Sequence, residues 1–135
     1  MKNFLMACCA AMAAVLAGCV GVDVPVRGTV DLRDKTVCVS ERGKFLTVDL
    51  KNALRRDGWQ VTVSNEPVRG VRYRLVDTWT SAGEVMVQHF DIRLVDTETG
   101  KDVVRLKGHG KRSREIVKIF IRALHGEDYD GWDRR

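Results

Sequence analysis

The sequence lacks the short motifs that mark common catalytic and nucleotide-binding sites. It has no Gly-x-Ser-x-Gly, no His-Glu-x-x-His and no glycine-rich phosphate loop, and histidine occurs only 3 times. Nucleophilic catalysis needs a nucleophile, a base and an orienting group brought together, and no such set is recognisable. These absences favour a non-enzymatic protein, although a catalytic site without a known motif is left open.

Long apolar runs are also scarce, and the one that stands out is at the N-terminus. Phe4–Ala17 is apolar without interruption and follows the basic Lys2. A helix needs about 20 apolar residues to cross the hydrocarbon core of a bilayer, whereas this run has 14. A short apolar run behind a positive charge is typical of an export signal, so we expect residues 1–18 to be a signal peptide.

The end of this run, Leu16-Ala17-Gly18-Cys19, resembles the lipobox of bacterial lipoproteins. The resemblance implies cleavage between Gly18 and Cys19, a diacylglycerol on the Cys19 thiol and an N-acyl chain on its amine. Each buried methylene contributes about 0.8 kcal/mol, so two or three acyl chains make a durable anchor. Val20, where inner-membrane lipoproteins typically carry Asp, implies the outer membrane facing the periplasm. The alternatives are an ordinary secretory signal with a chance cysteine and a buried alanine-rich helix.

Cysteine is too scarce in the expected mature chain to form a disulfide within the fold. Cys8 and Cys9 leave with the signal and Cys19 takes the lipid, so Cys38 has no partner within the chain. The 117 residues that remain of 135 suit one domain with an apolar core. We expect Cys38 to be a small buried apolar residue; a redox or nucleophilic thiol is the alternative.

Charge is of mixed sign and only mildly basic. Of the 23 Lys and Arg residues only Lys2 lies in the signal, which leaves 22 against 18 acidic residues. Such a surface could attract an anionic envelope polymer or lipid headgroups, although an ordinary solvated surface explains it as well. Nucleic acid is not expected as a partner in the envelope.

The pattern of apolar residues predicts the first elements. Residues 19–34 have no sustained period and contain Pro25 and Gly28, so we expect a lipidated tether. Lys35–Glu41 alternates like a strand. From Lys44 the apolar spacing becomes helical, and Gly58 suits a left-handed C-cap after the last turn. Residues 59–64 alternate again as a strand.

A polar loop at 65–70 separates that strand from three more elements of the sheet. Residues 71–75 alternate as a strand with Trp79 near its end, and Ser81-Ala82-Gly83 turns the chain into a strand at 85–95. A three-residue loop with Gly100 in the left-handed position would set Thr97 opposite Lys101. The cross-strand pairs that follow are Leu94 with Val104, Ile92 with Leu106, Phe90 with Gly108, Asp91 with Lys107, and His89 with His109.

The last helix and the tail complete the expected fold. Ser113 can cap an apolar helix that ends before Gly126, and residues 127–135 read as a charged tail. The order predicts an α+β fold: one domain, residues 35–126, with β-α-β-β-β-α order, a mainly antiparallel sheet and both helices on one face.

The face of the sheet without helices is the candidate contact surface. It would carry Arg72, Arg74, Arg93, Arg105 and Lys107, together with Val85, Val87 and Val103. An ordinary solvated sheet face is the alternative interpretation.

His89 and His109 are the sharpest candidates for chemistry, because the predicted register places them opposite each other on that face. Two imidazoles across a strand pair can hold a metal ion, and Asp91 on the same face is a candidate third ligand. Lys107 competes for its carboxylate. Two neighbouring surface histidines with no metal is the alternative, and the metal question stays open.

Several features together resemble a family of small uncharacterised proteobacterial lipoproteins. They are the lipobox, Lys35-Thr36-Val37-Cys38-Val39, Phe45-Leu46, Leu54, Gly58 and Trp79. This family implies no activity or cofactor beyond the covalent lipid. The element order is more distantly similar to accessory lipoproteins of envelope transport and assembly systems, which dock to a partner. We therefore expect a non-enzymatic accessory module that binds an envelope partner. The alternative is a metal-binding or catalytic periplasmic domain centred on His89 and His109.

Overall fold

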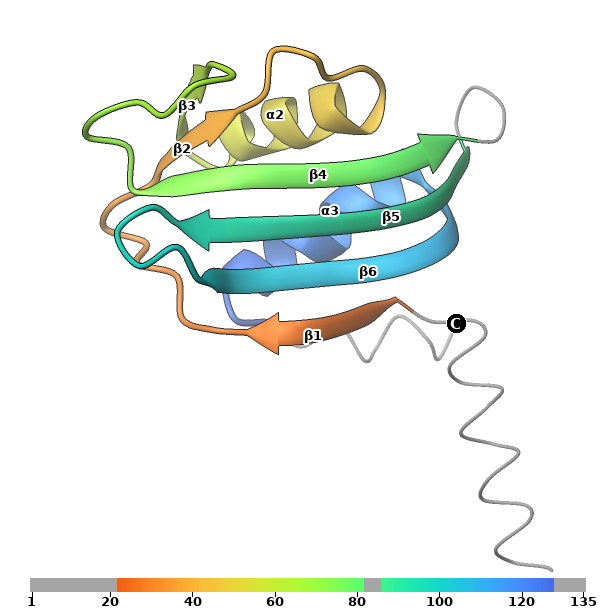
Figure 1. Ribbon diagram of the computed structural model, residues 1–135. Helices are drawn as coiled ribbons and strands as arrows, with labels where there is room; N and C mark the ends of the chain where they lie inside the picture. The colour runs from red at the N-terminus through yellow and green to blue at the C-terminus, as the bar shows by residue number, and fades with distance from the viewer. Residues whose placement is uncertain (1–21, 82–85, 128–135) are drawn as a thin grey trace, which may run out of the picture.

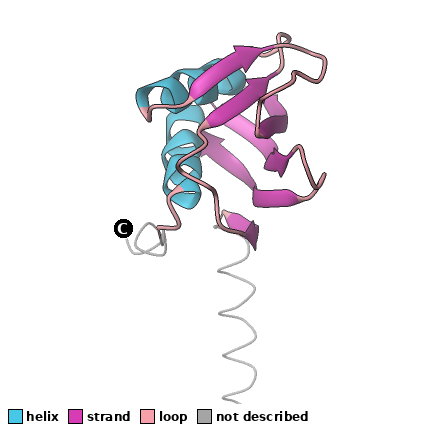
Figure 2. Cartoon of the chain, turned by 90° about the vertical axis from the view of Figure 1, so that its left-hand side faces the viewer, coloured by secondary structure: helices cyan, strands magenta, loops and turns pink. Residues whose placement is uncertain are grey.

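A computed structural model describes residues 22–81 and 86–127, which form a mixed sheet with two helices on one of its faces (Figures 1 and 2). The predicted signal peptide (residues 1–18), Cys19, Val85 and the predicted tail after Glu127 lie outside the described residues. The elements are β1 (Asp23–Arg27), β2 (Thr36–Val39), α2 (Leu46–Arg56), β3 (Gln60–Val63), β4 (Tyr73–Ser81), β5 (Met86–Asp96), β6 (Asp102–Arg112) and α3 (Ser113–Leu124).

The sheet has the strand order β1-β6-β5-β4-β2-β3. The pairs from β1 to β4 are antiparallel, whereas β2 pairs in parallel with both β4 and β3. The predicted α+β fold with a mainly antiparallel sheet is therefore confirmed. The predicted β-α-β-β-β-α order is wrong, because it lacks β1 and has three strands between the helices where the structure has four. No helix in the described part of the chain is long and apolar enough to cross a bilayer.

The expected tether is wrong over β1, which is an edge strand of the sheet. Val22 and Val24 are buried, and Asp23 pairs with Lys107 of β6. Pro25 argues against a central strand, but an edge strand tolerates a residue without an N–H. Gly28 is also structural, because a Cβ atom there would lie 2.7 Å from the carbonyl oxygen of Val103.

The predicted register of the β5–β6 hairpin is confirmed, although its loop is one residue longer than predicted. Asp96 N donates to Lys101 O at 3.0 Å, and Gly100 N donates to Asp96 O at 2.8 Å. A register shift next to Val95 then restores the expected pairing. All five predicted pairs are present: Leu94 with Val104, Ile92 with Leu106, Phe90 with Gly108, Asp91 with Lys107, and His89 with His109.

A bulge in β5 corrects the predicted position of Val87. Thr80 pairs with His89 but Ser81 pairs with Val87, so Gln88 is an extra residue on β5. The bulge turns Val87 towards the helices, where it is 2 % exposed. Val87 therefore belongs to the core and not to the open face.

The core lies between the sheet and the two helices. Leu46, Leu50 and Leu54 of α2 and Ile116, Phe120 and Leu124 of α3 cover the inner face of the sheet (Figure 2). Trp59, Tyr73 and Phe90 are buried in this core, and Trp79 packs against it partly buried.

Both helix starts differ from the sequence prediction. Ser113 is the first residue of α3 but makes no cap; its hydroxyl donates instead to Asp49 Oδ2 of α2 at 2.5 Å. Phe45 and Val48, two of the apolar residues after Lys44 whose spacing predicted this helix, are 42 % and 37 % exposed.

Candidate functional site

The open face of the sheet holds its arginines in ion pairs between neighbouring strands. Arg105 makes a two-pronged contact with Asp91, with Nε 3.0 Å from Oδ1 and Nη2 2.7 Å from Oδ2. Arg93 pairs with Asp102 at 3.4 Å. The hydrogen bonds from Arg105 hold the pKa of Asp91 below its usual value, so the pair is charged across the neutral range.

These pairs change the character of the predicted contact face. Asp91 lies opposite Lys107 as predicted, but its carboxylate binds Arg105 instead, because the guanidinium offers two aligned donors. Arg72 pairs with Asp96 at 3.2 Å, and Arg74 donates to Asn65 O at 3.3 Å. The face that the sequence analysis predicted to be basic is therefore largely charge-balanced.

His89 and His109 lie side by side on this face, with ring centroids 6.2 Å apart and planes inclined at 44°. Their spacing would let a metal ion lie between the rings. Asp91, the candidate third ligand, is held by Arg105. Across residues 22–81 and 86–127, no three His, Cys, Asp or Glu side chains form a metal-ligating group.

Cys38 is a buried free thiol, as expected. Its side chain is 3 % exposed, and Sγ lies 3.5 Å from the Ser64 carbonyl oxygen and 3.9 Å from that of Glu66. The segment that follows β3 therefore covers the thiol on the face away from α2.

A partly buried polar cluster on the inner face of β4 was missed from the sequence. Thr47 Oγ1 donates to Asp77 Oδ2, and Trp79 Nε1 donates to Thr47 Oγ1 at 3.2 Å. Burial raises the pKa of the Asp77 carboxyl. The signal was present in the alternation of β4, since Asp77 shares its face with the buried Tyr73 and Leu75.

Phe45 caps α2 in a strained conformation beside this cluster. Its φ is 43°, the one positive value at a non-glycine residue in the described chain. Such a backbone costs about 1–3 kcal/mol and persists only when its surroundings impose it. The Phe45 ring contacts Trp79 edge-on, with centroids 6.1 Å apart and planes at 85°. The contacts around Phe45, including the Trp79 ring, therefore hold an exposed aromatic ring at the surface despite this strain.

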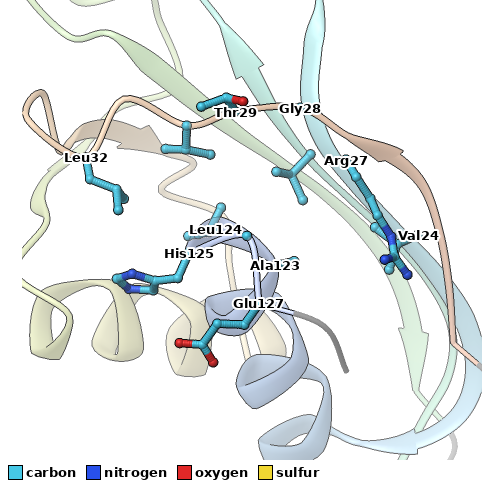
Figure 3. Close-up of a pocket in the computed structure, with 12 residues that line it drawn as sticks. Val24, Arg27, Gly28, Thr29, Leu32, Ala123, Leu124, His125 and Glu127 are labelled. Carbon is cyan, nitrogen blue, oxygen red and sulfur yellow. The ribbon is translucent and has the colours of Figure 1, made fainter. Parts of the chain in front are cut away.

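A cavity of about 320 Å³ lies between the segment after β1 and the end of α3 (Figure 3). Its walls are mostly apolar, with Val24, Leu32 and Leu124 among them, and His125 lies at its edge. The imidazole is already engaged by Asp57, with Nε2 2.8 Å from Oδ2. The cavity is thus a gap in the apolar packing with little polar chemistry of its own.

The fold and these surfaces define a small α+β domain with one helix-covered and one open sheet face. No family model and no curated protein matches the chain. Solved structures do match, among them two of the PelC dodecamer from Paraburkholderia phytofirmans. The first is 19 % identical with a TM-score of 0.55, covering 80 % of this chain and 98 % of that chain. The second, a leucine-to-methionine variant, is 18 % identical with a TM-score of 0.50, covering 78 % and 95 %. At this identity the likeness shows the fold.

Proposed function

We propose that the protein is a lipid-anchored, non-enzymatic accessory module of the bacterial cell envelope that binds a protein partner through its open sheet face. The observation that carries the proposal is the fixed pattern of alternating charges on that face. Arg105–Asp91 and Arg93–Asp102 are held in place before any partner arrives, so little side-chain entropy is lost on binding. The pairing also favours a protein over an anionic polymer, which needs unpaired cations.

The anchor in this proposal is the acylated Cys19, and its support is the complete lipobox Leu16-Ala17-Gly18-Cys19. Val20 favours the outer membrane facing the periplasm. Mass spectrometry of the protein extracted from membranes tests this directly. We expect an N-terminal Cys19 carrying diacylglycerol and an N-acyl chain; a Cys19→Ala variant should keep Met1 and lack both lipids. A parent chain with an unmodified Cys19 would refute the anchor.

We further propose that the chain assembles with copies of itself. The two similar structures are dodecamers, and the shared fold spans nearly the whole of their chains. Native mass spectrometry of the detergent-extracted protein should show one closed oligomer. A strictly monomeric protein across the micromolar range would remove this part of the proposal.

Docking through the open face is testable with a photo-crosslinking amino acid at Val76. Val76 is half-buried on β4 next to Arg93, on the open face. Val48 on the exposed side of α2 is the matched control. We expect a crosslinked partner in cells from position 76 and none from position 48.

A charge swap separates recognition from folding. Exchanging the pair as Arg105→Asp with Asp91→Arg keeps an ion pair but reverses the pattern, so the fold should survive and the position 76 crosslink should disappear. Retention of the crosslink in a folded swap variant would exclude this face as the docking surface.

The alternative function is metal binding at His89 and His109, which the 6.2 Å separation of their rings supports. Zinc or copper titration distinguishes it. A rise in melting temperature and a shift of the histidine NMR signals, both absent from a His89→Ala, His109→Ala variant, would establish the site. Unchanged signals in the parent protein would exclude it.

A further inference from the structure

The distance between the proposed anchor and the folded domain is short. Val22 is already buried and β1 begins at Asp23. Two residues separate Cys19 from Val22, and even a fully extended chain spans only about 11 Å over these three Cα–Cα steps. A lipid on Cys19 therefore holds the edge of the sheet close to the bilayer, where a 16-residue tether would have let the domain move away.

The strand directions decide which end of the domain lies near that anchor. Because β1 is antiparallel to β6, it starts beside Lys107, the central residue of β6, and runs from there away from the end of β6 that leads to α3. The end of β6 pairs with the start of β5 through Met86 and Arg112. The end of β4 and the segment between β2 and α2 are on the same side of the molecule (Figure 1). We call this side the anchor end and define it by residues 42–45, Trp79, Met86 and residues 111–114.

Among the described residues, the anchor end carries cations that form no ion pair. Arg42, Lys44, Arg112 and Arg114 are exposed and Lys111 is half-buried. None of the five forms an ion pair within the part of the chain that the structure describes, in contrast to the arginines of the open face.

The acidic groups at this end leave a net positive charge. The carboxylate of Glu41 accepts a hydrogen bond from Asn65, Asp49 accepts one from Ser113, and Glu115 lies in the first turn of α3. Phe45, Arg112, Arg114 and Lys118 also line one groove between the starts of the two helices. The positive charge is thus concentrated around the exposed Phe45 ring.

Exposed apolar side chains lie among these cations. Phe45 is 42 % exposed in its strained conformation, and Met86 is 36 % exposed. The Trp79 ring supports Phe45 from behind and is fixed by its hydrogen bond to Thr47. Aromatic rings beside Lys and Arg are the side chains that favour the boundary between headgroups and acyl chains.

We infer that the anchor end lies on the headgroup layer of the bilayer that holds the lipid, with its cations on anionic lipids and Phe45 at the headgroup boundary. This inference rests on the proposed anchoring through Cys19. It assigns the domain a fixed orientation, in which the open sheet face stands roughly upright from the membrane and is reachable by a partner in the same membrane.

An environment-sensitive fluorophore on a cysteine tests the orientation in the full acylated protein. We would place it at Met86→Cys in the anchor end and, as the matched control, at Lys101→Cys in the β5–β6 loop at the opposite end. The protein is reconstituted in vesicles of phosphatidylcholine with 30 % phosphatidylglycerol, with detergent-solubilised protein as reference; this fraction is about that of an anionic membrane surface.

We expect a blue shift and quenching by spin-labelled lipids at position 86 and neither at position 101. Arg112→Glu with Arg114→Glu, or Phe45→Ser, should abolish the signal at position 86. Arg55→Glu with Arg69→Glu, two exposed cations outside the anchor end, should leave it unchanged. High salt should weaken the charge contribution.

Mass spectrometry of the same sample separates the two proposals. In one outcome, the protein is acylated and bound to vesicles, but the probe at position 86 is as exposed to water as the probe at position 101. This result overturns the orientation and still supports the anchor. A blue shift at position 86 in vesicles without quenching by spin-labelled lipids assigns the anchor end to a protein contact and also overturns the orientation. A Cys19 without acyl chains removes the anchor and the orientation together.

Discussion

The carboxylate of Asp57 contacts Nε2 of His125 through both oxygens, at 2.8 and 2.9 Å, and so joins the C-terminal ends of α2 and α3. Two more groups meet the same residue. Trp59 Nε1 donates to Asp57 Oδ2 at 3.1 Å, and Lys35 Nζ donates to the Asp57 carbonyl oxygen at 2.7 Å. One residue therefore connects both helices to the segments that begin β2 and β3.

Replacement of Asp57 by Ala should destabilise the fold by about 2 kcal/mol, because it leaves the His125 ring and the Trp59 indole N–H without their acceptor. Urea denaturation followed by circular dichroism measures the change. Glu127→Ala, an exposed acidic residue at the same end of α3, is the control and should be neutral. A neutral Asp57→Ala variant would show that the contacts contribute nothing to stability.

Gly108 is required by the ring of Phe90, which lies across the strand pair. A Cβ atom at position 108 would lie 2.5 Å from Phe90 Cζ, and the ring is 4 % exposed and has little room to move. Gly108→Ala should therefore cost about 1–3 kcal/mol, as overpacking does. The cost should shrink in a Phe90→Leu background, and Lys107→Ala should be nearly neutral. Equal costs in the two backgrounds would mean that the ring is not the cause.

Asp77 and Asp91 should respond to pH in opposite ways. Burial raises the folded-state pKa of Asp77, so its ionisation at neutral pH destabilises the fold, and stability returns as the pH falls through that pKa. Asp77→Asn should therefore gain stability relative to the parent at pH 7, with the difference narrowing towards pH 4. Denaturation at both pH values measures it. A difference independent of pH would show that Asp77 ionises without cost.

The folded-state pKa of Asp91 is lowered by Arg105, so this carboxylate stabilises the fold above its usual pKa, and the contribution is lost as the pH falls through the folded-state value. Asp91→Asn should lose about 0.5–1 kcal/mol, the range of a partly exposed pair. The loss should stay constant from pH 7 to about 4.5 and disappear in stronger acid. A loss that varies between pH 7 and 5 would contradict this.

Cys38 should not react with thiol reagents in the folded protein, because its Sγ is covered by the segment after β3. Ellman's reagent should modify it only as urea unfolds the chain. A Phe45→Cys variant, whose new thiol is at an exposed position, should react at once and serves as the positive control. Fast reaction of Cys38 in the native protein would indicate an accessible thiol.

Residues with strong local patterns could be predicted from the sequence. Alternation along β5 and β6 places Ile92 and Leu94 on one face, and only one register pairs them with apolar partners, so the neighbouring His89 and His109 follow. Gly58 after the last turn of α2 has φ 88°, as its predicted C-cap role requires. The alternation of β4 also predicts that Asp77 faces the helices. It does not predict the hydrogen bonds that place this carboxylate in a partly buried cluster.

The sequence by itself therefore determined the helices and strands whose apolar residues recur regularly within the element. The lipobox stays a prediction. Only the tertiary structure decided that β1 joins the sheet, because its partner β6 is some 80 residues away along the chain. An edge strand such as β1 also shows little regular alternation of apolar residues in its sequence. The tertiary structure also decided the position of Val87 and the partner of Asp91. A single bulge reverses the alternation of a strand, and a carboxylate within reach of two cations binds the one whose donors align best.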